Sequence, residues 1–409
     1  MRRVVITGLG VISPIGNSKA DFLEALRTAR SGIKVRTPDY PDLKTRIAGF
    51  TDFNPTDFLT RPELTGMDRV SQFTLAAAKQ AMADAQIAFE ENEWPRVGVA
   101  LGTGLGGANT INETYVQLFK KDPNRVHPLS VLMTMSNAPA AHIALKYQAQ
   151  GPSMTYTCAC SSSNIAIGEA ARQIRHGYAD VMFTGGTEAM LNYGSLKGWE
   201  AMRVLGLEDP EDPSRSCKPF SKNRTGLVLG EGAAVFILES LEHAQRRGAK
   251  IYAELVGYGS TNDPGHITRP SVEGQAQAMR AALQDAMLTP DAIDYINAHG
   301  TATAVNDATE TAAIKQVFGE RAYRLPVSST KSMHGHLLGA AGAVEMMACL
   351  LALEEQMLPP TAGVIEPDPE CDLDYVAGVA RRGVAVRTVM SNSFAFGGSN
   401  AVLIVQKRP

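Results

Sequence analysis

The chain has 409 residues, enough for two or more folding units or for one large domain. Apolar residues make up 44% and charged residues 20%, close to the average soluble globular protein, which excludes disordered, collagen-like and coiled-coil chains. Lys and Arg number 39 and Asp and Glu 42, a net charge of -3, so no global field favours nucleic acid or an anionic membrane. A local basic patch that recruits an acidic partner is still allowed.

The cysteines are few, odd in number and scattered, which is not a disulfide framework and indicates a reducing compartment. The N-terminus MRRVVITGLGVISPIG imitates a signal peptide, but Gly8, Gly10, Pro14 and Gly16 interrupt the apolar stretch and no cleavage site follows. No window approaches the ~18 unbroken apolar residues of a membrane span. We therefore expect a soluble, cytoplasmic protein that begins with a strand.

Short β-branched runs that end at glycines predict strands turning into helices. Five runs in the first half are matched in order by five in the second: 4–10, 97–104, 154–160, 180–186 and 233–238, then 253–259, 293–300, 325–331, 385–394 and 401–405. The third run of each half leads into a helix-favouring segment, and glycine-rich stretches join the fourth run to the fifth. Ligands in such sheets bind beyond the ends of the strands.

The matching order predicts an α/β protein of two duplicated halves, 1–250 and 251–409, with helices such as 274–287 covering the sheets in layers. An α/β chain with similar alternation and no duplication is the alternative. Two longer connections, 105–150 and 187–232, have no counterpart in the second half and are candidates for a substrate lid or for partner contacts.

Cys160 ends the third run and directly precedes a helical pattern at 161–176. A cysteine at a helix N-terminus lies near unpaired amides and the positive end of the helix dipole, which favours the thiolate and lowers the pKa. Cys160 is therefore a candidate nucleophile; the alternative is a buried structural cysteine. We expect Cys158, within the strand, to pack. Cys158 and Cys160 would be half of a zinc site, but no second pair completes it.

His299 and His336 each follow a predicted strand of the second half, so both should open toward the sheet edge that presents Cys160. A thiol and two imidazoles suit acyl transfer through a thioester, with the imidazoles stabilising an oxyanion or enolate. Taken singly, each histidine is more often an ordinary hydrogen-bonded residue. His334 and His336 form a possible metal pair, but no third ligand is evident, so we expect no metal.

Two further segments belong to the same region. Lys331 begins the segment of His336, where a buried ammonium would hold a histidine neutral or organise hydrogen bonds. The glycine-rich turn in NSFAFGG, residues 392–398, offers backbone amides to an oxyanion, and its two phenylalanines can close a pocket against water. A tight turn with two core aromatics explains the same residues.

Four segments together resemble the β-ketoacyl-acyl-carrier-protein synthases of the elongating type, condensing enzymes of the thiolase-like superfamily. They are CACSS at 158–162, NAHGTAT at 297–303, TKSMHGHLLGAAG at 330–342 and SNSFAFGGSN at 391–400. The similarity covers essentially the whole chain. A Cys-His-His set is typical of elongating enzymes, whereas initiating synthases use Cys-His-Asn. The resemblance implies the thiolase-like layered α-β-α-β-α fold.

The resemblance also implies roles for the catalytic residues. Cys160 would accept the acyl chain from an acyl carrier protein, and the backbone amides of Cys160 and Phe396 would form the oxyanion hole. His299 and His336 would bind the malonyl thioester carbonyl and support decarboxylation to an enolate. The enolate would attack the acyl group on Cys160 in a Claisen condensation, the chain-lengthening step of fatty acid elongation.

For the surrounding residues, the resemblance implies that Lys331 and Glu310 organise the histidines and associated water. Thr301 and Thr303 would hydrogen-bond the phosphopantetheine arm, and Phe394 would gate access for the second substrate. No cofactor is implied, because the phosphopantetheine arrives on the carrier protein.

At the periphery, the resemblance places Arg69 and Arg203 where similar enzymes meet the acidic carrier protein. Leu105 would lie at the acyl pocket near a dimer interface, where it would limit chain length. The implied assembly is a homodimer, with a heterodimer of related subunits as the alternative.

Three positions depart from the family pattern: His334 stands where threonine is common, Cys158 where a small hydroxyl residue is common, and Ala395 where glycine is common. The Cβ of alanine disfavours positive φ, so Ala395 should restrict or re-hinge the turn at Phe394. These departures leave the chemistry intact. They leave open a dedicated ketosynthase of a polyketide or polyene pathway that works with a partner subunit.

Two other classes compete with a condensing enzyme. Residues 102–107 match Gly-x-Gly-x-x-Gly after a strand, but a nicotinamide reductase needs an acidic residue at the end of a second strand. The candidate, Asp122, follows a segment without a strand pattern. A noncatalytic carrier-protein scaffold with this fold predicts ordinary reactivity for Cys160.

Overall fold

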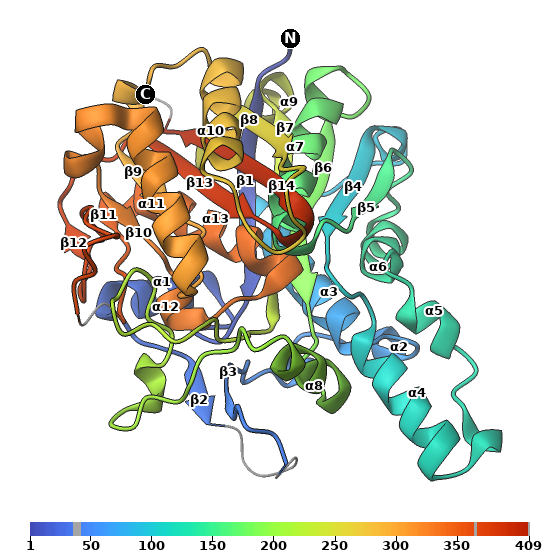
Figure 1. The fold of residues 1–409 in the computed structure, drawn as a ribbon. Helices are drawn as coiled ribbons and strands as arrows, with labels where there is room; N and C mark the ends of the chain where they lie inside the picture. The colour runs from blue at the N-terminus through green and yellow to red at the C-terminus, as the bar shows by residue number, and fades with distance from the viewer. Residues whose placement is uncertain (36–41, 364–365, 408–409) are drawn as a thin grey trace.

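A ten-stranded mixed sheet forms the centre of the computed structural model, which describes residues 1–35, 42–363 and 366–407 (Figure 1). Its strands lie in the order β10-β9-β13-β14-β8-β1-β7-β6-β4-β5. In chain order they are β1 Val4–Ile12, β4 Val97–Gly102, β5 Ser153–Tyr156, β6 Val181–Glu188, β7 Gly232–Ser240, β8 Ala253–Asn262, β9 Tyr295–Asn297, β10 Val327–Ser328, β13 Thr388–Phe394 and β14 Ser399–Gln406. Every run predicted to be a strand contributes one of them.

The two halves of the chain use one strand order. Numbered along each half, both run third-second-fourth-fifth-first, as β5-β4-β6-β7-β1 and as β10-β9-β13-β14-β8. In each half the second strand is parallel to its two neighbours, and the fifth is antiparallel to the fourth and the first. The duplicated strand pattern is therefore confirmed. The exact boundary near residue 250 stays a prediction, since β1 and β8 pair and join both halves into one sheet.

Helices divide the molecule into layers. Helix α7 (Ser162–Arg175) contacts β6 and β4 of its own half and β14 and β8 of the other, and α13 (Ala341–Glu355) contacts β13 as well as β6 and β7. These two helices form the middle layer. Helix α3 (Arg69–Ala85) covers β1 and β7, while α10 (Val272–Ala286) covers β8 and β14 and packs on α11 (Ala304–Phe318). Because α7 and α13 each contact strands of both halves, one half of the sheet lies on either side of them, and the α-β-α-β-α arrangement is confirmed.

Helix α13 shows why the middle layer forms. Its sequence AGAVEMMACLLALEE is apolar nearly all round, and all of its residues from Ala341 to Leu353 are buried. A helix without a polar face is stable in water only between other elements. Within it, Glu345 is a buried carboxyl among apolar neighbours.

The longer connections lie outside the layers. Helices α4 (Ala108–Lys120) and α5 (Ser130–Thr134) form an arm that projects from the body, at the lower right in Figure 1, and α8 (Tyr193–Ala201) lies beside it. The remaining helices and strands are α1 Lys19–Thr28, α2 Arg61–Leu64, α6 Ala138–Tyr147, α9 Leu241–Arg246, α12 Lys331–His334, β2 Ile33–Val35, β3 Ile47–Gly49, β11 Met357–Leu358 and β12 Arg381–Arg382. Throughout the described ranges, no helix has both the length and the apolar character to cross a membrane.

Candidate active site

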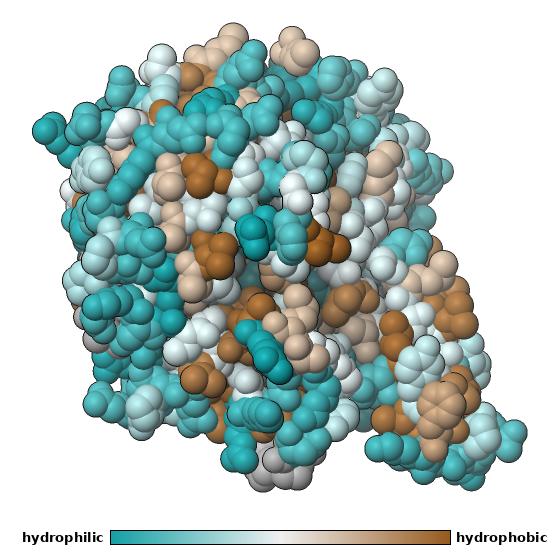
Figure 2. Space-filling model, in the orientation of Figure 1, coloured by the Kyte–Doolittle hydropathy of each residue, from teal (hydrophilic) through white to brown (hydrophobic). Residues whose placement is uncertain are grey.

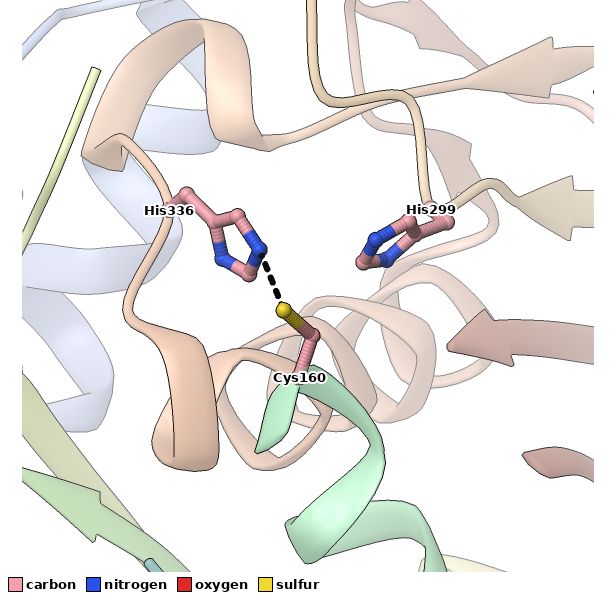
Figure 3. A group of neighbouring side chains, drawn as sticks. All are labelled: Cys160, His299 and His336. Atoms are coloured by element: carbon pink, nitrogen blue, oxygen red, sulfur yellow. Dashed lines mark hydrogen bonds between the residues drawn. The ribbon is translucent and has the colours of Figure 1, made fainter. Parts of the chain in front are cut away.

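Three reactive side chains from the two halves meet in one place (Figure 3). Cys160 comes from the turn just before α7, His299 from the loop after β9, and His336 from the loop between α12 and α13. Their sulfur and nitrogen atoms lie within 4.8 Å of one another, and all three residues are buried. The Cys160 sulfur is 3.0 Å from His336 Nε2, and the two imidazole rings are 5.4 Å apart and nearly perpendicular.

The turn Ala159–Ser161 aims the thiol at the histidines. Ala159 adopts a left-handed φ of 48°, a conformation that costs an L-residue about 1 kcal/mol and that recurs at functional sites. Hydrogen bonds hold the turn: the Ser161 hydroxyl reaches Ser399 O at 2.7 Å, and the Cys158 amide donates to Ser162 Oγ at 2.9 Å. The strained turn is thus fixed by contacts with both halves.

Burial dominates the acidity of Cys160. It raises the pKa of the thiol to about 12, although the charge of Lys331 and a hydrogen bond from the Phe396 amide both lower it. The sequence predicted the opposite direction from the position at the start of α7, because the desolvation of a fully buried sulfur is invisible in a local pattern. At rest the group is therefore a thiol.

The hydrogen-bonding partner of Nδ1 in each imidazole fixes which ring nitrogen holds the proton. His336 Nδ1 accepts from the Leu338 amide at 3.1 Å, so the ring proton is on Nε2. His299 Nδ1 faces the Lys331 ammonium at 3.4 Å, which likewise leaves the proton on Nε2. Burial first, and then the positive charge of Lys331, hold the pKa of both rings well below 6.5. Both histidines are therefore neutral and present Nε2–H donors to the cavity.

The same hydrogen bonds argue against a resident metal ion. A metal-ligating imidazole offers a lone pair to the metal and donates its other N–H to an acceptor. Here Nδ1 of His299 and of His336 each faces a donor instead. His334 does not join the group: its Nδ1 donates to Gly335 O at 2.8 Å, and its Nε2 accepts from Thr330 Oγ1 at 3.0 Å.

Buried charges organise the loop of His299. The Lys331 ammonium donates to His299 O at 2.6 Å and forms an ion pair with Glu345. Glu310 accepts from the amides of His299 at 2.9 Å and Gly300 at 2.8 Å, and from Asn392 Nδ2 at 3.2 Å. Burial raises the pKa of Glu310 to about 7. Sequence reasoning found Lys331 and Glu310 but missed Glu345, whose signal is a carboxylate in the middle of an apolar helix.

A cavity of about 260 Å³ opens over the three residues. Its lining includes the predicted residues Thr301, Thr303, Phe394 and Phe396. Trp199 and Val204 also line it and lie in the 187–232 connection, a lid candidate from the sequence. Other lining residues were not indicated by any pattern, among them Ile267, Arg269 and Val305. The hydroxyls of Thr301 and Thr303 are 2.9 Å apart.

The two phenylalanines of the glycine-rich turn have different surroundings. Phe394 is the last residue of β13, pairs with Asn400 and packs its ring 6.1 Å from that of His299. Phe396 lies in the turn itself, followed by Gly397 with φ 82° and Gly398 with φ 81°. Ala395 has φ −114°, so its Cβ imposes no strain in this conformation, and the positive φ angles fall on the two glycines.

The predicted peripheral residues lie away from the three-residue centre. Arg69 makes a two-pronged ion pair with Glu231, at 3.0 and 2.8 Å, and also donates to Thr51, although its side chain is still about a third exposed. Arg203 is exposed and adjoins the cavity residue Val204. Leu105 is 44% exposed and lines a separate hollow along α4 rather than the cavity over Cys160.

The glycine motif at 102–107 does not belong to a dinucleotide site. Asp122 lies beyond the far end of α4, where it accepts a hydrogen bond from the Asn124 amide and pairs with Arg125 at 3.3 Å. A ribose-binding carboxylate should end a second strand next to the glycine loop. The reductase alternative is therefore wrong.

Comparisons with known proteins agree with this geometry. The model of the beta-ketoacyl synthase N-terminal domain matches residues 1–244, and that of the C-terminal domain matches residues 252–364. The chain is 44% identical to 3-oxoacyl-[acyl-carrier-protein] synthase 2 of Synechocystis sp., covering 99% of this chain and 98% of that protein.

Among solved structures, a beta-ketoacyl synthase from Burkholderia phymatum superposes with a TM-score of 0.93 at 36% identity. A ketosynthase bound to a hexaketide, in complex with its type II PKS acyl-carrier protein, superposes with a TM-score of 0.91 at 34% identity. Both comparisons cover 100% of each chain. Given these matches and the Cys-His-His centre, the chain belongs to the β-ketoacyl synthase family.

Proposed function

We propose that this protein is a β-ketoacyl-acyl-carrier-protein synthase of fatty acid elongation, which condenses an enzyme-bound acyl group with malonyl-acyl-carrier protein. The central observation is the donor arrangement: two neutral imidazoles present Nε2–H groups beside the sulfur of Cys160. Such donors stabilise negative charge on a thioester oxygen without themselves accepting a proton.

In the first half-reaction, Cys160 Sγ attacks the carbonyl of the acyl thioester. The carbonyl oxygen becomes an oxyanion, which the amides of Cys160 and Phe396 stabilise. The C–S bond to the phosphopantetheine breaks, and the departing thiol leaves with the proton that Cys160 loses. The acyl group is then a thioester on Cys160.

In the second half-reaction, the malonyl thioester carbonyl accepts hydrogen bonds from Nε2–H of His299 and His336. The C–C bond to the carboxylate breaks and CO₂ leaves. The electron pair of that bond forms an enolate, whose oxygen is held by the two Nε2–H donors. The enolate carbon attacks the acyl carbonyl, the C–S bond to Cys160 breaks, and a β-ketoacyl thioester leaves. Cys160 departs as a thiolate and takes up a proton from water, which restores the resting thiol. Lys331 and Glu310 hold the His299 loop during these steps, and Thr301 and Thr303 bind the phosphopantetheine arm.

We assign two roles at the cavity mouth. Phe396, on the glycine turn, is better suited than Phe394 to move when substrates enter, because Phe394 is fixed in β13 against His299. The acyl carrier protein docks near exposed Arg203. Arg69 takes a smaller part, since Glu231 already neutralises its guanidinium. No resident cofactor is needed, because the reacting thioesters arrive on the carrier protein.

The proposed assembly is a homodimer formed at the free edge of β5. This strand ends the ten-stranded sheet, and an exposed edge is a site for pairing. Figure 2 shows hydrophobic side chains gathered on the neighbouring arm of α4 and α5, a composition typical of an interface. The exposed apolar residues there are Leu105, Ile111, Tyr115, Phe119, Leu129, Val131, Leu132 and Met135. With all five cysteines free, we assign the protein to the cytoplasm.

A dedicated polyketide or polyene ketosynthase paired with a related subunit is the second candidate. Its support is the structural similarity to the ketosynthase that holds a hexaketide. In that case Leu105 and the arm would contact a different subunit rather than a second copy, and the reaction at Cys160 would be unchanged.

A reconstituted assay tests the proposal. The purified protein is incubated with acyl-carrier proteins of different chain lengths, alone and then with malonyl-acyl-carrier protein, and analysed by mass spectrometry. We expect one acyl mass on the peptide containing Cys160, then loss of that mass and a β-ketoacyl product. Cys160→Ser should acquire no thioester, whereas Cys217→Ser should behave like the parent. Failure of every acyl donor to label Cys160 would overturn the proposal.

A further inference from the structure

Two aromatic rings from different halves of the chain stack beside the nucleophile. The indole of Trp199, in α8, and the phenyl ring of Phe396, in the turn after β13, have centroids 6.3 Å apart and planes inclined by 25°. Both residues line the cavity over Cys160. The backbone amide of Phe396 is also the group that hydrogen-bonds the Cys160 sulfur. The residue that supplies one ring of the stack thus also supplies an amide of the proposed oxyanion hole.

The turn that contains Phe396 is held firmly on one side. The Gly397 amide donates to Ile267 O at 2.7 Å, and the Ala395 amide donates to Ser399 O at 2.9 Å. A Cβ on Gly398 would lie 2.2 Å from Asp263 O, so the backbone is closely packed there. A Cβ on Gly397 would meet no atom within 4 Å, so the turn has free space on its other side.

Two consecutive glycines with positive φ make this turn easy to deform. Among the described residues, the aromatic contact of Phe396 is with Trp199. An offset ring pair contributes about 0.5–1.5 kcal/mol beyond its buried area. That is enough to bias a flexible turn toward one position.

Helix α8 provides a fixed platform for the indole. Its N-terminus is capped by Asn192, which accepts from the Ser195 amide at 3.0 Å. Near its end, Glu200 accepts from the Thr45 amide at 2.9 Å. Trp199 packs against an apolar cluster that also contains Cys160, Leu196, Leu227 and Leu229.

We propose that Trp199 is a positioning residue for acyl transfer: its indole holds the Phe396 ring and thereby keeps the Phe396 amide directed at the Cys160 sulfur. The proposal rests on the proposed function, because it needs an oxyanion to form there. The side chain of Trp199 makes no bond to the reacting atoms. Its effect should therefore appear in the rate of acylation at saturating substrate more than in the apparent affinity for the acyl donor.

The test measures the rate of Cys160 acylation by intact-protein mass spectrometry in single-turnover experiments. Loss of one oxyanion donor lowers a rate 10² to 10³-fold, and a misdirected donor loses part of that, so Trp199→Ala should slow acylation by about tenfold at saturation. Trp199→Phe, which keeps a ring for stacking, should stay within about twofold of the parent. The chain has one other tryptophan, and Trp94→Phe is the matched control with an expected unchanged rate.

A double-mutant cycle separates positioning through Phe396 from a general packing role. In a Phe396→Ala background, which keeps the amide but removes the ring, Trp199→Ala should slow acylation no further. Additive effects of the two substitutions would overturn the proposal, as would an unchanged acylation rate in Trp199→Ala. If the parent protein is not acylated by any donor, the proposed function itself fails, which is a different result from normal acylation that is insensitive to Trp199.

Discussion

In the first half of the chain, the third strand β5 reaches its helix α7 through the turn Ala159–Ser161, and Cys160 lies in that turn. In the second half, β10 reaches α13 only after α12 and a further loop, and His336 lies in that loop. The equivalent connection has thus been lengthened in one half. The short turn places the thiol of Cys160 directly before a helix. The longer connection allows the imidazole of His336 to reach that thiol.

The longer connection is held by the other half. The His336 amide donates to Val228 O at 2.6 Å, and His336 O accepts from the Gly230 amide at 2.9 Å, both within the 189–231 connection of the first half. His299, by contrast, is held from within its own half by Glu310 and Lys331. One half therefore supplies the nucleophile and holds one histidine, while the other half holds the second histidine by itself.

The buried ion pair within the second half should give the largest effect. Lys331 and Glu345 are both fully buried, so Lys331→Met leaves an uncompensated buried carboxylate and should cost about 3–5 kcal/mol of unfolding free energy. Lys331→Met combined with Glu345→Leu should recover most of that loss. Urea unfolding measures both changes, with Lys222→Met, at an exposed pair with Glu366, as the control. A cost below about 1 kcal/mol for the single substitution would show that the pair is not buried in solution.

The histidines should separate the two half-reactions. His299→Ala and His336→Ala should each lower the condensation rate by on the order of 10² to 10³, because each removes a donor to the enolate oxygen. Acylation of Cys160 uses the backbone amides and should fall by less than about tenfold. His176→Ala, at the exposed C-terminal end of α7, should change neither rate. Selective loss of acylation, with condensation intact on a preloaded enzyme, would contradict the assignment.

Access rather than acidity should distinguish the cysteines. Burial raises the pKa of the thiols of Cys160, Cys217 and Cys371 alike, to about 12, but only Cys160 among them lines the described cavity. We expect iodoacetamide to alkylate Cys160 on the order of tenfold faster near neutral pH, as measured by peptide mass spectrometry. Equal rates at the three sites would mean that the cavity does not admit small molecules.

The ten strands and their duplication follow from the sequence because β-branched runs ending in glycine are local signals, and their matching order is visible without any contact. The meeting of Cys160, His299 and His336 follows from their positions after strands. Three features could not be predicted. The raised pKa of Cys160 depends on desolvation, the partner of Lys331 lies on a distant helix, and the position of Trp199 depends on how α8 packs against the turn of Phe396. Each of these depends on tertiary packing, which leaves no periodic pattern in the chain.

The pH dependence of condensation should show the smallest change, and its direction follows from the charges around the rings. Burial and the Lys331 ammonium lower the pKa of His299 and His336 well below 6.5, so the neutral donor form persists and their protonation should not reduce the rate between about pH 8 and pH 6. Lys331→Met removes one of these causes, which raises the pKa of both rings and moves the acid limb to higher pH. The buried carboxyls of Glu310, Glu345 and Glu188, each with a pKa of about 7, titrate in the same range, so Glu310→Gln, Glu345→Gln and Glu188→Gln identify any change that comes from them. An acid limb near pH 6.5 that survives each of these three substitutions would show that the imidazoles are protonated at neutral pH and cannot be the donors assigned here.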